Sequence, residues 1–171
     1  MIKAHVHLIT GGQRSGKSEY AEKQALARSK CPIYLATSKK WDDEQAQRIE
    51  VHQGRRSSVW QTIEEEISLG KNDLSGRLVL LDCITLWLTN IFTVQQFDLG
   101  KSWVQACKEW DELIGQQTHL IVVTNEIGMG TIPMERGARM FVDLHGQMNQ
   151  MIATQASEVT FMISGIPWQV K

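Results

Sequence analysis

Short apolar runs alternate with longer amphipathic stretches along the chain, which is the pattern of a parallel sheet covered by helices. We expect strands at His5–Thr10, Ile33–Thr37, Arg77–Asp82, His119–Thr124 and Glu158–Ser164, with a weaker strand near Ser58–Thr62. We expect helices at Lys17–Ser29, Asp42–Gln53, Ile84–Phe92, Lys101–Gly115 and Glu135–Ala156. The polar, turn-rich segment Gly70–Gly76 reads as a connection within one domain, so a single α/β domain over residues 1–171 accounts for the whole pattern.

The segment between the first strand and the first helix fits the P-loop pattern G-x-x-x-x-G-K-S. A glycine-rich turn that opens a helix points backbone N–H groups at one spot, where the helix dipole already favours negative charge. Lys17 would reach the terminal phosphates and the Ser18 hydroxyl would ligate Mg²⁺. We therefore predict a nucleoside triphosphate site at Gly11, Gly12, Gln13, Arg14, Ser15, Gly16, Lys17 and Ser18.

A second chemical feature is the run Leu78–Asp82, four apolar residues that end in a carboxylate. In P-loop folds such a strand delivers its terminal Asp to the Mg²⁺ shell, and ligands gather at the carboxyl ends of the strands. The alternative is that Asp82 caps the helix that starts at Ile84. We favour the metal or nucleotide role.

Composition narrows the class of protein. A net charge of −1 gives no general attraction to nucleic acid or anionic membranes, and we expect neither nucleic-acid binding nor membrane insertion. The three cysteines are widely spaced and form no C-x-x-C pair, so neither a disulfide framework nor a zinc site is indicated, and a cytoplasmic location is expected. The strand at His119–Thr124 runs into Asn125-Glu126-Ile127-Gly128 rather than the Asn-Lys-x-Asp segment of regulatory GTPases, which leaves a small-molecule kinase or nucleotidyltransferase.

Further blocks in a fixed order make the chain resemble a known family from Gly11 to Gly165. These blocks are Tyr34-Leu35-Ala36-Thr37-Ser38, Asp42-Asp43-Glu44, Arg48-Ile49-x-x-His52, Trp60-x-Thr62-x-Glu64, Leu81-Asp82-Cys83, Thr89-Asn90, Thr124-Asn125-Glu126-x-Gly128-Met129-Gly130-x-x-Pro133 and Asn149-Gln150. Together with the P-loop they resemble the bifunctional adenosylcobinamide kinase/adenosylcobinamide-phosphate guanylyltransferases of cobalamin assembly. The resemblance implies a P-loop NTPase-like (RecA-like) fold with a mostly parallel sheet flanked by helices.

The resemblance also implies two reactions. ATP or GTP phosphorylates the hydroxyl of adenosylcobinamide, a corrinoid, and GMP from GTP is then transferred onto that phosphate through a covalent histidine–GMP intermediate, with loss of pyrophosphate. His52 matches the family's nucleophile, and Lys17 serves the phosphates. The implied nucleotide contacts outside the P-loop are Ala36, Thr37, Ser38, Gln53, Gly54, Arg55, Arg56, Glu64 and Asp82, with Mg²⁺ at Ser18 and Asp82. The family's assembly implies a homotrimer.

The chain departs from the pattern of the family at two positions, and two alternative functions remain open. Asp82 stands where many relatives have Glu, which bears on a guanine contact more than on Mg²⁺, and Gln13 stands where a smaller residue is common. A P-loop kinase of another specificity and a non-catalytic nucleotide-binding regulator are the alternative functions. Without the resemblance, His52 would read as a solvated surface histidine.

Overall fold

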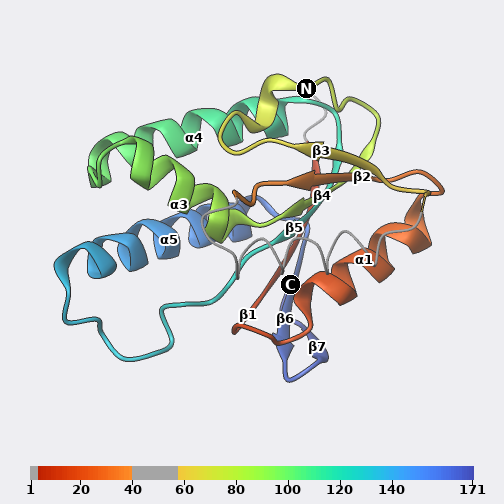
Figure 1. The fold of residues 1–171 in the computed structure, drawn as a ribbon. Helices are drawn as coiled ribbons and strands as arrows, with labels where there is room; N and C mark the ends of the chain where they lie inside the picture. Colours follow the sequence, from red (N-terminus) through yellow and green to blue (C-terminus); the bar gives the residue numbers. More distant parts are fainter. Residues whose placement is uncertain (1–3, 40–57) are drawn as a thin grey trace.

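The computed structural model describes residues 4–39 and 58–171 (Figure 1). The helix expected at 42–53 and the predicted site residues His52, Gln53, Gly54, Arg55 and Arg56 lie outside the described residues.

Seven strands form one sheet in the order β3-β2-β4-β5-β1-β6-β7, and every neighbouring pair is parallel except β6 and β7. The strands are β1 (His5–Gly11), β2 (Ile33–Ala36), β3 (Gln61–Glu64), β4 (Leu78–Asp82), β5 (His119–Val123), β6 (Glu158–Ile163) and β7 (Ile166–Gln169). One strand, β5, separates the P-loop strand β1 from β4, which ends in Asp82. The predicted α/β fold with a mostly parallel sheet is confirmed.

Helices cover both faces of this sheet (Figure 1). The described helices are α1 (Lys17–Arg28), the short 3₁₀ helix η1 (Leu69–Lys71), α3 (Ile84–Val94), α4 (Leu99–Gly115) and α5 (Arg136–Gln155). One face packs against α1, and the other packs against α3, α4 and α5. Buried helices on both faces explain why the central strands are continuously apolar.

Alternate residues of the central strands enter two separate cores. Leu81 of β4 and Val122 of β5 belong to the larger core under α3, α4 and α5, whereas Leu80 and Ile121 face α1. Each such fully buried aliphatic side chain stabilises the fold by roughly 2 kcal/mol. The sheet is therefore anchored from both sides at the strands that carry the predicted site.

Two strands differ from the sequence-based expectation. The strand expected at Ser58–Thr62 is displaced to Gln61–Glu64, where it pairs with β2. The strand β7 was not expected, and all of its residues are exposed. It pairs antiparallel with β6 and brings Trp168 opposite Phe161.

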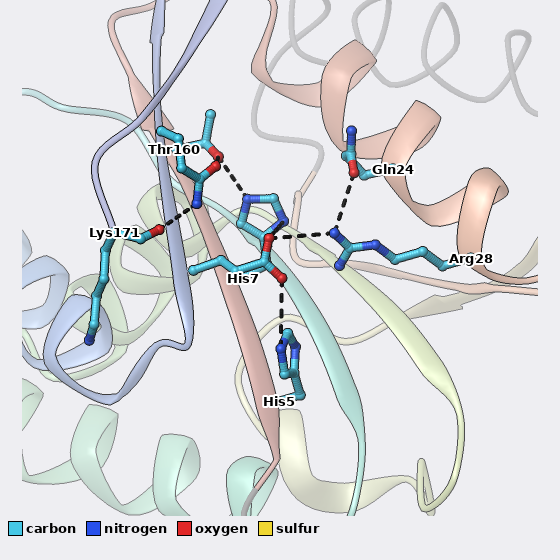
Figure 2. A network of polar contacts seen from close by, with 8 residues as sticks. His5, His7, Gln24, Arg28, Thr160 and Lys171 are labelled. Carbon is cyan, nitrogen blue, oxygen red and sulfur yellow. Dashed lines mark hydrogen bonds and ion pairs between the residues drawn. The ribbon is translucent and has the colours of Figure 1, made fainter.

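A polar network occupies the amino-terminal end of β1, away from the P-loop (Figure 2). The Thr160 hydroxyl donates to Gln169 Oε1 at 3.0 Å, so the buried His7 ring must donate from Nε2 to Thr160 Oγ1 at 2.8 Å. Its Nδ1 lies 4.0 Å from a Glu158 carboxylate oxygen that also pairs with Arg28 at 3.6 Å. Burial lowers the pKa of His7, and Glu158 partly offsets this effect. This histidine therefore joins β1 to β6 and β7, at the opposite end of the strand from the nucleotide motif.

Candidate active site

The P-loop is a tight turn between β1 and α1, and two glycines make its path possible. Gly16 is the N-cap of α1 with φ 89°, a left-handed conformation that favours glycine. At Gly11, where φ is 150°, a Cβ atom would lie 2.5 Å from the carbonyl oxygen of Met162. The turn therefore depends on the two glycines that the motif specifies.

Neighbouring segments hold this loop from two sides. The N–H of Gly165, in the turn between β6 and β7, donates to the carbonyl oxygen of Ser15 at 3.0 Å, and the N–H of Glu126 donates to that of Gly11 at 2.9 Å. Because carbonyl and amide point in opposite directions across a trans peptide, the contact at Ser15 directs the Gly16 N–H away from Gly165. The hairpin and the segment after β5 thus fix the orientation of P-loop amides.

Lys17 is the one buried cation of the P-loop. Its side chain lies back across the loop, where Nζ donates to the carbonyl oxygen of Gly12 at 2.6 Å and to Ser15 Oγ at 3.5 Å. Burial lowers the pKa of Lys17, while Cys83 and Asp82 act in the opposite direction. The ammonium group is thus held at the helix start by carbonyl and hydroxyl oxygens. Gly12, Gln13 and Arg14 are exposed, and Ser18 is half-buried.

Asp82 ends β4 at the same edge of the sheet. Its Oδ2 accepts a hydrogen bond from the Tyr34 hydroxyl at 2.7 Å, and the Trp60 ring packs edge-on against Tyr34 with 5.7 Å between centroids. The N-cap of α3 is Cys83, so the alternative in which Asp82 caps this helix is wrong. The carboxylate is instead oriented by a side chain from the neighbouring strand β2.

The predicted residues at the ends of β2 and β3 converge on this edge as well. Ala36 pairs with Glu64 on one side and with Asp82 on the other, so the three lie side by side on adjacent strands. Thr37 is buried, and its hydroxyl donates to the carbonyl of Cys83 at 2.8 Å and accepts from the Cys83 N–H at 2.9 Å. The Thr37 side chain therefore joins β2 to the end of β4, and Ser38 follows it at the same edge, half-buried.

Asn90 also supports this edge of the sheet, although the sequence alone assigned it no role. It is buried in α3, and its amide donates to the carbonyls of Thr37 at 2.8 Å and Glu66 at 3.0 Å. It holds the segments that follow β2 and β3, and its place in the Thr89-Asn90 block was the signal available in the sequence.

A second polar cluster, not predicted, lies behind the end of β5. The buried His145 of α5 has Nε2 2.9 Å from the Thr85 hydroxyl, and the Thr85 oxygen accepts from the Asn125 N–H at 3.1 Å. Asn149 accepts from the Thr124 hydroxyl at 2.8 Å and donates to the Asn125 carbonyl at 3.0 Å. Burial lowers the pKa of His145 to about 4, so the ring is neutral near neutral pH. The cluster fixes the segment that leads to Glu126.

The described residues can provide oxygen ligands for a metal only in small number. No group of three or more His, Cys, Asp or Glu side chains in residues 4–39 and 58–171 is placed to hold a metal ion. One carboxylate and one hydroxyl, Asp82 and Ser18, fit Mg²⁺, which keeps several waters and uses phosphate oxygens as further ligands.

Within residues 4–39 and 58–171, no helix combines the length and apolar character needed to cross a membrane.

Comparisons with known proteins cover almost the whole chain. The family model described as cobinamide kinase / cobinamide phosphate guanyltransferase matches residues 7–170. The bifunctional adenosylcobalamin biosynthesis protein CobP of Pseudomonas aeruginosa is 38% identical over 171 residues, covering 96% of each chain. CobU of Escherichia coli is 37% identical over 185 residues, covering 96% of this chain and 98% of the relative. Among solved structures, the flagellar accessory protein FlaH of Methanocaldococcus jannaschii matches with a TM-score of 0.49 and 12% identity, covering 100% of this chain and 80% of that one.

The family expected from the motif blocks is thereby confirmed, since the matched residues include the P-loop, Asp82 and the segment after β5. The chain belongs to the cobinamide kinase / cobinamide phosphate guanyltransferase family.

Proposed function

We propose that this chain catalyses both reactions of its family at the edge of the sheet where β1, β4 and β5 end. In the first, ATP or GTP phosphorylates adenosylcobinamide; in the second, GMP from GTP is transferred onto that phosphate to give adenosylcobinamide-GDP and pyrophosphate. The observation that carries the proposal is the P-loop at the start of α1, with Lys17 buried beside it and Asp82 at the end of β4.

The P-loop would hold the phosphates of the donor. The backbone N–H groups at the start of α1 and the helix dipole favour an anion there. When nucleotide binds, the Lys17 ammonium would leave the Gly12 carbonyl and bind phosphate oxygens. Because Lys17 is buried, its attraction to these oxygens would be stronger than in water. Positioning and charge stabilisation supply most of the catalysis in phosphoryl transfer.

Mg²⁺ would be held by Ser18 and Asp82. When bound, it would neutralise charge on the phosphates during transfer. Tyr34 holds one oxygen of the Asp82 carboxylate, so the direction of this ligand is set by β2 before nucleotide arrives. Both side chains offer oxygen ligands, which Mg²⁺ prefers.

His52 would be the nucleophile of the second reaction. A neutral imidazole is nucleophilic at physiological pH, and attack on the α-phosphorus of GTP would form the histidine–GMP adduct. Arg48 stands four residues earlier, and Arg55 and Arg56 follow, so phosphate-binding cations surround His52 in the sequence. Ala36, Thr37, Ser38 and Glu64 would contribute the remaining nucleotide contacts with Gln53 and Gly54.

Covalent labelling tests this proposal. Incubation with GTP labelled at the α-phosphate, followed by denaturation, should leave an acid-labile and base-stable label on a peptide that contains His52. The His52→Ala variant should carry no label, and His119→Ala is the matched control because His119 is exposed at the start of β5. Label on a different histidine, or full labelling of the His52→Ala variant, would reject the assignment.

We also propose that the chain is a single domain, works in the cytoplasm and assembles as a homotrimer. All described strands join one sheet, which supports the single domain. Cys31, Cys83 and Cys107 are all free thiols, which supports a reducing compartment. Sedimentation analysis at several protein concentrations would test the trimer.

A further inference from the structure

A pocket of about 620 Å³ opens between α5 and the sheet, directly beside the P-loop. Its walls come from β1 and β6, from the segment after β5, and from α5. The volume lies in the range of roughly 300–1,000 Å³ that is typical of small-molecule sites. Neither the P-loop amides nor Lys17 lines it, so the pocket is distinct from the predicted phosphate site.

The chemistry of the lining excludes a phosphate group as its natural occupant. Aliphatic and aromatic side chains such as Val142, Val159 and Phe161 form much of the surface, and Glu126 and Asp143 supply carboxylates. Among the described residues, the lining contains carboxamides but no Lys, Arg or His side chain. A neutral or cationic molecule with a large apolar body and hydrogen-bonding amides fits this lining, whereas a triphosphate would face two uncompensated carboxylates.

Two residues connect the pocket to the nucleotide motif. Thr10 lines the pocket and directly precedes Gly11, and its Oγ1 is buried without a hydrogen-bond partner among the described residues. Glu126 also lines the pocket, and its backbone N–H is bonded to the Gly11 carbonyl. One Glu126 carboxylate oxygen, Oε1, accepts from the Gly128 N–H at 2.9 Å, which orients the group in its own turn. A polar rim with an oriented carboxylate therefore stands between the pocket and the P-loop.

We propose that this pocket holds the phosphoryl acceptor, an alcohol carried on a bulky, amide-bearing and largely apolar molecule, and that Glu126 receives the proton of its hydroxyl. This inference rests on the proposed kinase function. The acceptor oxygen forms a bond to the γ-phosphorus while the bond from that phosphorus to the bridging oxygen breaks. The nucleoside diphosphate leaves with the electron pair, and the hydroxyl proton passes to the Glu126 carboxylate. The second reaction begins from a phosphate ester with no such proton, so it makes no comparable demand on Glu126.

The first test compares the two reactions in Glu126→Gln. Loss of a general base lowers the rate by about 100-fold or more, so the kcat of phosphorylation should fall by that factor. Guanylyl transfer, measured separately with prepared acceptor phosphate, should fall far less. The control is Glu112→Gln on the exposed face of α4. Equal loss in both reactions, or no loss of phosphorylation, would overturn the catalytic assignment.

The second test fills the pocket. Gly146 of α5 lines it, and a Cβ atom added there meets no atom within 4 Å, so Gly146→Leu should fold and occupy the space. The KM for adenosylcobinamide should rise about tenfold or more, while the Kd for GTP serves as the internal reference. Gly115→Leu is the matched control, since its Cβ also meets no atom within 4 Å but Gly115 lies at the end of α4.

The outcomes separate this inference from the function on which it rests. A wild-type protein that never phosphorylates adenosylcobinamide would refute the proposed function itself. If the wild type is active but Gly146→Leu and Gly115→Leu have the same KM for the acceptor, only the pocket assignment is refuted. A rise in KM restricted to Gly146→Leu, combined with the selective loss in Glu126→Gln, would support both parts.

Discussion

Acidification should destabilise the fold through His145, the buried histidine of α5. Its ring lies among Thr85, Thr124 and Asn149, and none of these partners is a carboxylate. A protonated ring would have to donate from both nitrogens and carry its charge in a buried site where the described residues provide no counter-ion. The folded state therefore favours the neutral ring, whereas the unfolded chain allows protonation at the ordinary pKa.

The size of this effect follows from the pKa of His145, which burial lowers from 6.5 to about 4. Each pKa unit corresponds to about 1.4 kcal/mol between the two protonation states, so full protonation costs at most about 3.5 kcal/mol. Between these pKa values the unfolded chain binds more protons than the folded protein, so stability rises with pH. The contribution is complete above the unfolded pKa of 6.5 and is lost as the pH falls toward about 4.

Urea unfolding at a series of pH values from about 7.5 to about 4.5 would measure this term. His145→Gln removes the titrating group, so the difference in unfolding free energy between wild type and variant should shrink by about 2 kcal/mol as the pH falls through this range. His119→Gln, at an exposed position, controls for general charge effects. Parallel pH curves for wild type and His145→Gln would refute this reasoning.

Four further substitutions address the proposed active site. Lys17→Ala should abolish phosphorylation and guanylyl transfer together, because one buried ammonium serves the phosphates in both; activity in either assay at the wild-type rate would contradict a shared site. Asp82→Asn should weaken Mg²⁺-dependent activity by about 100-fold while leaving the unfolding midpoint near that of wild type, and a Mg²⁺ titration identical to wild type would exclude the metal role. Tyr34→Phe removes the hydrogen bond to this carboxylate and should cost about 1 kcal/mol in urea unfolding, with a smaller loss of activity than Asp82→Asn. His52→Ala should lose the transferase and keep measurable kinase activity, and mass spectrometry for the GMP adduct provides the check.

Local patterns predicted the strands that are buried on both faces. The runs at Leu78–Asp82 and His119–Val123 are nearly all apolar, because the side chains of residues 79–81 and 120–123 are buried in one core or the other. The short strand β7 has no such pattern, since its residues are exposed and it contains Pro167. It is held by antiparallel pairing with β6 across the turn at Ser164-Gly165, and this dipeptide was the signal in the sequence that could have revealed the hairpin. The position of β3 depends instead on a long-range contact, because its register is set by β2.

Some residues of the candidate site could likewise be predicted from the sequence, and others could not. The P-loop and Asp82 were predictable, because their chemistry is contained in a few consecutive residues. The contact of Tyr34 with Asp82 depends on which strands are neighbours, and sheet order is not a local property. The burial of His145 did leave a signal, since it shares a helical face with Met148 and Ile152. Its partners could be identified only once α3 and the end of β5 were placed beside it.

The position of β1 within the sheet has a consequence for synthesis on the ribosome. This strand is synthesised well before its two neighbours, β5 and β6, which begin at His119 and Glu158. The backbone groups of β1 therefore have no partners in the sheet until β5 and β6 have been made. The carbonyl of Ser15 gains its hydrogen bond later still, because Gly165 follows β6. A nascent chain stalled before β6 should bind no nucleotide at the P-loop, although it already contains every residue of the motif.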